Sequence, residues 1–205
     1  MDWNTEEQKI LRKMSDPLVI QDFLDNIDYN PSYECRSPRH VLSKRSAHCF
    51  EGALFAAAAL QYNGYPPLIA DLRAENDDDH VIAVFRRDRL WGAVAKSNFT
   101  TLRFREPVYR TVRELVMSYF DFYFNIYGVK SLRSYSLPLD LRIYDSKYWQ
   151  TTDDDLEYIG DKLDSVRHYP VAPPETIAHL GKATEIMLRA GMLGSNEEGL
   201  YKPKK

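Results

Sequence analysis

The stretch AHCFEGALFAAAALQYNG, from Ala47 to Gly64, decides what the rest of the chain can build around it. Alanine and leucine dominate it after Cys49, and alanine is the strongest helix former. The pair Asn63-Gly64 follows the apolar run and is typical of a helix C-terminus. The pattern predicts a buried helix that begins at or just before Cys49, and its small side chains allow neighbouring elements to pack closely.

Three β-like segments follow this helix after Pro66-Pro67. They run from Leu68 to Arg73, from His80 to Arg86 and from Leu90 to Asn98. A charged turn around Arg87-Asp88 joins the last two, so they are expected to form an antiparallel hairpin. The sequence therefore predicts a helix packed on an antiparallel sheet.

The flanking sequence adds helices at both ends of the chain. Capping patterns and apolar periodicity predict helices from Thr5, from Pro17 to Leu24, from Thr111 to a stop at Gly128, from Asp155 to Val166 and from Pro174 to Ala190. We expect a long loop over Asn30 to Ala47, a strand over Leu137 to Ile143 and a frayed tail over Ser195 to Lys205. The expected fold class is α+β in a single domain, residues 1–205, with a core over about 30–145 and a C-terminal helical extension over about 150–195.

Composition and charge exclude several classes of protein. The 205 residues are 44% hydrophobic and 28% charged, which is typical of a globular chain. Lys and Arg number 27 against 30 Asp and Glu, so the net charge of −3 gives no positive field for nucleic acid. The polar start MDWNTEEQKILRKM is unlike a signal peptide, and no apolar run approaches the roughly 18 residues of a membrane span. With only two cysteines, the chain is expected to be cytoplasmic, with neither nucleic-acid nor membrane partners.

Cys49 and His80 are the residues best placed to carry chemistry. A cysteine at a helix N-terminus lies beside unpaired N–H groups and the positive end of the helix dipole, which favour the thiolate. A nucleophile also needs a general base, and His80 opens the first strand of the predicted hairpin. The backbone N–H of Cys49 is a candidate donor to a developing oxyanion.

The order AHCFEGALFAAAAL, then a strand, then DDDHVIAVF (Asp77 to Phe85), then LWGAVAKSN (Leu90 to Asn98) resembles the transglutaminase-like branch of the papain-like cysteine enzymes. The resemblance covers about residues 46–99. It implies a papain-like core in which a cysteine heads a helix packed on an antiparallel sheet, a histidine lies on one strand, and an Asp or Asn on the next strand orients it. The first two positions correspond to Cys49 and His80.

The third position of that pattern departs from the family, because the expected Asp after Trp91 is missing. If the hairpin pairs Arg86 with Arg89, His80 faces Ala95, with Ser97 next along on the same face. Asn98 is a better chemical substitute, because its amide oxygen can accept a hydrogen bond from the imidazole, but it needs a bulge or strand end to turn inward. The candidates for the orienting residue are therefore Asn98 and then Ser97.

Other clusters offer competing interpretations. Cys35, His40, His48 and Cys49 have the ligand types of a zinc site, but their spacing does not fit one. A Cys35–Cys49 disulfide is disfavoured in a reducing compartment. Basic residues from Arg103 to Arg113 are expected to form a solvated face.

These observations favour cysteine-dependent acyl transfer on an amide or ester, of protease, amidase or transglutaminase type. The expected substrate is a peptide or protein amide, and the chemistry requires neither a cofactor nor a metal. The alternative is a transglutaminase-like module that has lost its catalytic site and binds a protein or peptide partner, because the orienting Asp is missing. The sequence leaves open the oligomeric state and the choice between hydrolysis and transamidation.

Overall fold

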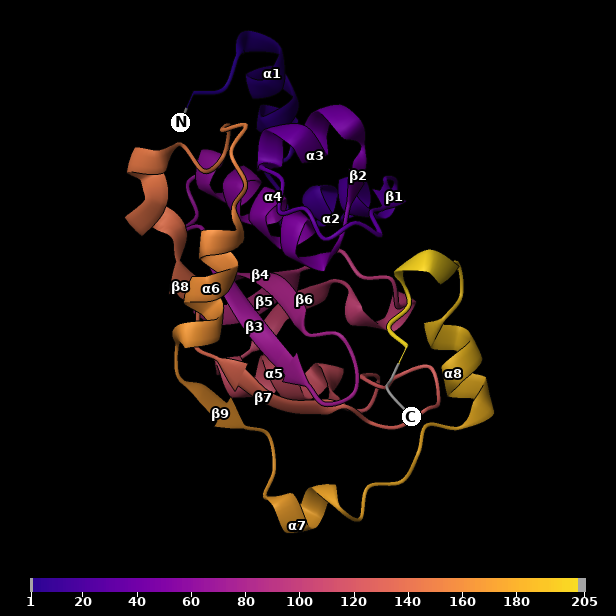
Figure 1. Ribbon diagram of the computed structural model, residues 1–205. Coiled ribbons are helices and arrows are strands. Elements are labelled where there is room, and N and C mark those ends of the chain that lie inside the picture. The colour runs from indigo at the N-terminus through magenta and orange to yellow at the C-terminus, as the bar shows by residue number, and fades with distance from the viewer. Residues whose placement is uncertain (1, 203–205) are drawn as a thin grey trace.

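The computed structural model describes residues 2–202 and centres on an antiparallel sheet of seven strands, which carries helices on both faces (Figure 1). Its main path runs β6-β5-β4-β3-β7-β9, and β8 pairs with β3. The strands are β3 (Leu68–Ala74), β4 (His80–Arg87), β5 (Leu90–Val94), β6 (Arg105–Tyr109), β7 (Leu132–Ser136), β8 (Leu139–Asp140) and β9 (His168–Pro170). This architecture confirms the expected α+β class.

Alternating side chains of β4 divide the core into two layers. Val81, Ala83 and Phe85 pack on the face covered by the alanine-rich helix α4 (Cys49–Tyr62). Ile82 and Val84 pack on the opposite face, which α5 (Val112–Phe120) covers. Because both faces of the sheet are covered, its central strands are buried almost throughout, as the apolar run from Val81 to Phe85 requires.

Three short helices surround α4 on its face of the sheet. They are α1 (Thr5–Lys13), α2 (Pro17–Asp25) and α3 (Pro38–Lys44), and a short parallel pair, β1 (Asp28–Tyr29) with β2 (Ser46–Ala47), lies beside them (Figure 1). Asp16 caps α2 as the sequence predicts. In α1 the capping residue is Asn4, whose side chain accepts from the backbone of Glu6 and Glu7, one position before the predicted cap.

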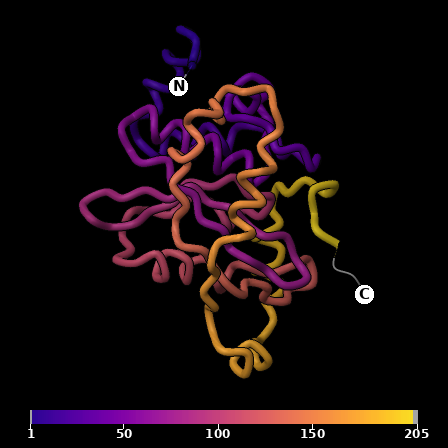
Figure 2. The backbone as a smooth tube through the Cα atoms, turned by 60° about the vertical axis from the view of Figure 1, so that its left-hand side comes forward, coloured from indigo at the N-terminus to yellow at the C-terminus, as the bar shows by residue number. Residues whose placement is uncertain are grey.

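The remaining helices follow β7 or lie on the α5 face. They are the 3-10 segments η1 (Thr100–Leu102), η2 (Leu141–Lys147) and η3 (Glu197–Gly199), with α6 (Glu157–Ser165), α7 (Pro174–Ile177) and α8 (Glu185–Gly191). Figure 2 shows the last part of the chain, in yellow, running along the side of the molecule after a loop that carries α7 below the sheet. In the part of the chain that the structure describes, no helix combines the length and apolarity needed to traverse a lipid bilayer.

Several predicted element boundaries are wrong. The expected loop over 30–47 contains α3 and β2, and the strand expected over 137–143 is only the two-residue β8 followed by η2. The helix expected to reach Gly128 ends at Phe120, because buried Tyr123 hydrogen bonds to the Asp78 carbonyl (2.8 Å) and Asn125 closes a turn onto Val129. The expected 174–190 helix is divided into α7 and α8.

The hairpin register is also wrong, by two residues. Arg86 pairs with Trp91, and Arg87 pairs with Leu90. Asp88 and Arg89 form the two-residue turn, both with positive φ (52° and 69°), as a type I′ turn requires. The predicted turn, Arg87-Asp88, has the same length but lies one residue earlier, and the sequence lacks the Asn-Gly pair that would locate such a turn.

Candidate functional site

Cys49 is the first residue of α4, at the end of the sheet where β4 begins. Gly52, one turn later, lets α4 pack closely against Lys96, because a Cβ built on Gly52 would lie 2.3 Å from the Cβ of Lys96. The Cys49 side chain is partly exposed, and its thiol donates to the carbonyl of Asp79 at 3.7 Å. The predicted cysteine therefore heads the predicted helix and contacts the segment that leads into His80.

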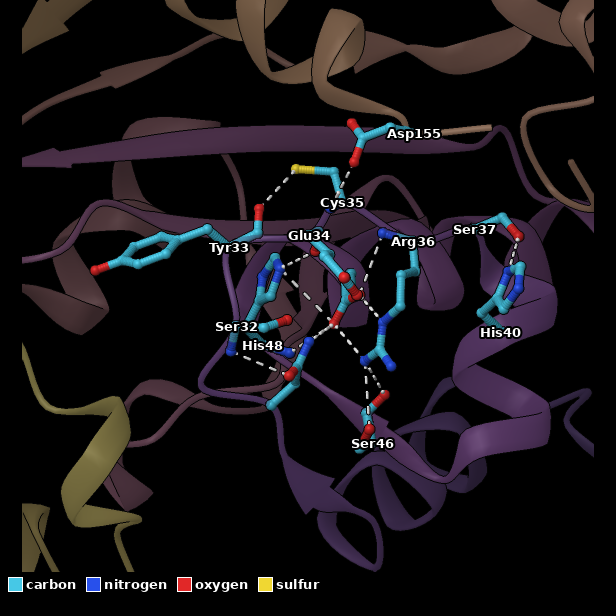
Figure 3. A network of polar contacts seen from close by, with 12 residues as sticks. Ser32, Tyr33, Glu34, Cys35, Arg36, Ser37, His40, Ser46, His48 and Asp155 are labelled. Atoms are coloured by element: carbon cyan, nitrogen blue, oxygen red, sulfur yellow. Dashed lines mark hydrogen bonds and ion pairs between the residues drawn. The ribbon is translucent and has the colours of Figure 1, made fainter. Parts of the chain in front are cut away.

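A buried carboxylate fixes the start of α4. Glu51, whose side chain is fully buried, accepts from the Arg36 guanidinium at 2.5 and 3.1 Å and from the backbone N–H of His48 at 3.1 Å. Asn30 donates to it at 2.9 Å. Figure 3 shows this network, with Arg36 extending toward Ser46. The 30–37 segment and the helix that carries Cys49 are thereby joined by one ionic cluster.

The Cys49 thiol is protonated at neutral pH. Burial raises its pKa to about 12, the negative charge of Asp78 adds to this effect, and hydrogen bonds from the N–H groups of Val81 and Phe50 oppose it. We expected a lowered pKa from the helix N-terminus. That expectation is wrong, because the Phe50 N–H contributes in the expected direction but desolvation outweighs it.

His80 is the first residue of β4 and is 3% exposed. Its Nε2 lies 2.8 Å from the carbonyl oxygen of Leu102 in η1, and the rings of Tyr119 and Tyr123 meet it edge-on. Since a carbonyl only accepts, Nε2 carries the proton and Nδ1 has the free lone pair. Burial lowers the pKa of His80 to about 4, although the bond to Leu102 raises it, so the imidazole is neutral.

Asn98 and Ser97 have other partners than the histidine. Asn98 donates to the carbonyl of Asn196 (2.9 Å) and accepts from the N–H of Asn196 (2.7 Å). Ser97 accepts from the N–H of Phe99 (3.1 Å). Among residues 2–202 no hydrogen bond joins either side chain to His80, which corrects the orienting role expected for them. The group that orients the imidazole is the Leu102 carbonyl, and a backbone acceptor has no signature in the sequence.

Two cavities meet at Cys49. The smaller, of about 50 Å³, is lined by both Cys49 and His80, together with Ser97, Asn98 and Leu102. The larger, of about 490 Å³, is open to solvent. Its lining includes Cys49, Tyr29, Tyr33, His48, Asp78, Asp79, Glu198 and Tyr201. Cys49 is thus accessible from a substrate-sized cavity and shares a small inner space with His80.

The residues considered for zinc have separate partners. His40 bonds to Ser37 and lies 3.5 Å from Asp153, whereas His48 bonds to the Glu34 carbonyl at 2.9 Å. Both cysteines are free thiols, so the disulfide is absent.

A carboxylate cluster adjoins Cys49, where Asp71, Asp79 and Asp164 each place an oxygen within 4.8 Å of the others and the Asp79 carbonyl accepts from the Cys49 thiol. Two of its carboxylates have partners within the chain. His168 lies 2.8 Å from Asp71, and Arg73 lies 3.1 Å from Asp164. Burial raises the pKa of Asp71 to about 6, while the bond from His168 opposes that rise.

The basic residues after Arg103 are held within the chain. Arg103 pairs with Asp25 at 2.9 Å, and Arg105 lies 3.9 Å above the Tyr119 ring. Arg113 donates to the Val171 carbonyl at 2.8 Å. Three of the four arginines in this cluster therefore have intramolecular partners.

No protein-family model matches the chain, and a search of curated proteins finds no match. Any functional assignment therefore depends on the residues around Cys49.

Proposed function

We propose that this chain is a transglutaminase-like cysteine enzyme that transfers an acyl group from an amide or ester through Cys49, with His80 as the general base. The observation that carries the proposal is the cavity that Cys49 and His80 line together. A second support is the Leu102 carbonyl, which holds the Nε2 proton of His80 and leaves Nδ1 to accept one. In this reading the carbonyl replaces the orienting Asp of the resembling family.

The reaction proceeds in two halves. Sγ of Cys49 attacks the substrate carbonyl carbon while Nδ1 of His80 takes the thiol proton, and the Cys49 N–H donates to the oxyanion. Collapse of the tetrahedral intermediate breaks the carbonyl–leaving group bond, and His80 returns the proton to the leaving amine or alcohol. Water or an amine then attacks the thioester, His80 takes its proton, and the thiol is restored.

The electrostatics of the pair favour general-base catalysis over a preformed ion pair. The pKa of Cys49 is raised to about 12 and that of His80 is lowered to about 4, so thiol and imidazole are both neutral over the range between. Proton transfer must then accompany attack on the carbonyl. The rate of acylation should therefore be independent of pH where both groups stay neutral.

This pH independence provides the test. The protein is incubated with p-nitrophenyl acetate from about pH 5 to pH 8, and acetylation of each cysteine is followed by peptide mass spectrometry. We expect a flat profile at Cys49 in the native chain. In His80→Asn the profile should rise about tenfold per pH unit, because only the thiolate fraction then reacts. Cys35, whose thiol donates to the Tyr33 carbonyl, is the internal control with the rising profile.

The second candidate function is a binding module without catalysis, and one contact favours it. The thiol of Cys49 hydrogen bonds to the Asp79 carbonyl, and across the described chain it has no such bond to His80. If this reading holds, the Cys49 profile rises with pH in the native chain and does not change in His80→Asn. That result would replace the enzyme with a protein- or peptide-binding module.

A further inference from the structure

The cavities around Cys49 are closed on one side by a segment that is remote in sequence. Residues 196–202, hereafter the 196–202 segment, include Gly199, Leu200 and Tyr201, which line both the 490 Å³ cavity and the 50 Å³ cavity. Figures 1 and 2 show the C-terminal chain, in yellow, beside the body of the molecule. The sequence predicted a frayed tail here, and for residues 195–202 that expectation is wrong, whereas 203–205 lie outside the described residues.

Three contacts hold this segment in place. Asn98 makes two hydrogen bonds with the backbone of Asn196, and the Asn196 side chain in turn accepts from the N–H of Glu198. Thr100 donates to the Leu193 carbonyl just upstream, at 2.6 Å. A Cβ on Gly199 would lie 2.4 Å from the Tyr29 ring, so the segment packs directly on that wall of the cavity.

These anchors lie next to the elements that build the site. Asn98 follows β5, and Thr100 opens η1, the turn whose Leu102 carbonyl orients His80. Both anchoring side chains therefore extend from the stretch that borders the small cavity. Asn98 bonds to the backbone of Asn196 in the segment, and Thr100 bonds to the backbone of Leu193 just upstream, so these bonds control the position of the segment rather than one of its side chains.

We propose that the 196–202 segment limits the size of the group that can reach Cys49, and that Asn98 is the positioning residue that holds this wall. The part of this inference that concerns acyl groups rests on the proposed function. Access of a reagent to the Cys49 thiol can be measured whether or not the chain is an enzyme. Acyl groups that fit the closed cavity would be accepted, and larger ones would need the segment to move away from Tyr29.

The test compares two reagents that react by the same thiol addition and differ in size, N-methylmaleimide and N-(1-pyrenyl)maleimide. Rates at Cys49 and Cys35 are measured together at one pH, because tryptic peptides ending at Arg36 and beginning at Ser46 separate the two residues. In Asn98→Ala the pyrenyl rate at Cys49 should rise about tenfold, as expected from the loss of two hydrogen bonds that oppose local opening. The N-methyl rate should change less than about twofold.

Two further variants distinguish an effect of the cavity wall from a general loss of stability in the fold. Gly199→Ala places a methyl group against Tyr29 and should raise the pyrenyl rate in the same way. Asn63→Ala, which removes hydrogen bonds to the carbonyls of Leu11 and Met14, is the matched control and should leave the size ratio unchanged. An unchanged pyrenyl rate in Asn98→Ala, or an equal rise in Asn63→Ala, would overturn the proposal.

The same measurement in His80→Asn distinguishes the two proposals. Addition of a maleimide needs only the thiol, so the size dependence should persist in that variant if the wall exists. A retained size dependence together with a Cys49 acylation profile that rises with pH in the native chain would reject the enzyme and keep the wall. A lost size dependence together with a flat native profile would reject the wall alone.

Discussion

Replacing Glu51 by Gln tests how strongly the buried ionic cluster stabilises the start of α4. The carboxylate accepts five hydrogen bonds, from Asn30, from three nitrogens of Arg36 and from the His48 backbone. Gln is nearly isosteric, so the substitution leaves no cavity. It removes the charge and turns one acceptor oxygen into an NH₂ group that faces donors.

The expected loss follows from these contacts. The two oxygens receive two and three hydrogen bonds. The better orientation of the Gln amide therefore keeps three and loses two. A hydrogen bond to a charged group contributes about 1.5–3 kcal/mol. Because the Arg36 side chain is 20% exposed, we take the lower end for the two lost bonds and expect the free energy of unfolding to fall by about 3 kcal/mol. For a chain of this length, that corresponds to a fall in Tm of about 6–12 °C.

The effect should depend on pH with a definite sign. Burial opposes the ionisation of Glu51, but hydrogen bonds from Arg36 and Asn30 and the charges of His48 and Arg36 outweigh it and lower the pKa. A lowered folded pKa means that the stabilisation is complete above the unfolded value of about 4.3 and is lost as the pH falls through the folded value. The difference between native chain and variant should therefore shrink in acid.

Urea unfolding followed by circular dichroism measures this difference at neutral pH and at several lower values. Glu6→Gln is the matched control, because Glu6 forms a pair with Lys9 in which both side chains are more than half exposed. Such surface pairs contribute about 0–1 kcal/mol. A loss below about 1 kcal/mol in Glu51→Gln, no larger than that of the control, would refute the reasoning about the buried cluster.

Three further predictions concern other parts of the fold. The folded pKa of His80 is about 4 and its unfolded pKa is about 6.5, so the free energy of unfolding should decline by up to about 3 kcal/mol as the pH falls from 6.5 to 4. This decline should be absent in His80→Asn, and the same dependence of the unfolding free energy on pH in both chains would contradict the prediction. Arg89→Gly should stabilise the hairpin by about 0.5–1 kcal/mol, since φ at this position is +69° and glycine adopts it freely, and a loss of stability in thermal unfolding would argue against the two-residue turn. Gly52→Ala should destabilise by about 1–3 kcal/mol although alanine favours helices, because its Cβ would overlap Lys96, and an increase in Tm would mean that α4 packs less closely than described.

Local signals predicted the nucleophile helix and the strand that carries His80. The alanine-rich run after Cys49 has high helix propensity, and its buried packing agrees with that preference. The apolar run after His80 forms β4, whose side chains are buried on both faces of the sheet. Capping pairs likewise located the starts of α2 and α5, because a cap acts within a few residues of its helix.

Long-range contacts decided what those signals could not. The protonation states at the site depend on desolvation, which raises the pKa of Cys49 against the local effect of the helix N-terminus. The partner of Asn98 lies 98 residues away, at Asn196, so no local pattern could indicate it. The end of α5 depends on Tyr123, whose hydroxyl meets a carbonyl in the segment before His80.

The sequence by itself determined that a cysteine heads a buried helix, that a histidine opens a strand of an antiparallel sheet, and that the class is α+β. Propensity, alternation and caps act over a few residues, which is why they indicate these features. Only the tertiary structure decided that a backbone carbonyl orients His80, that Glu51 joins Arg36 beneath Cys49, and that the 196–202 segment closes the cavity. Those arrangements arise because buried polar groups must find partners wherever the folded chain brings them.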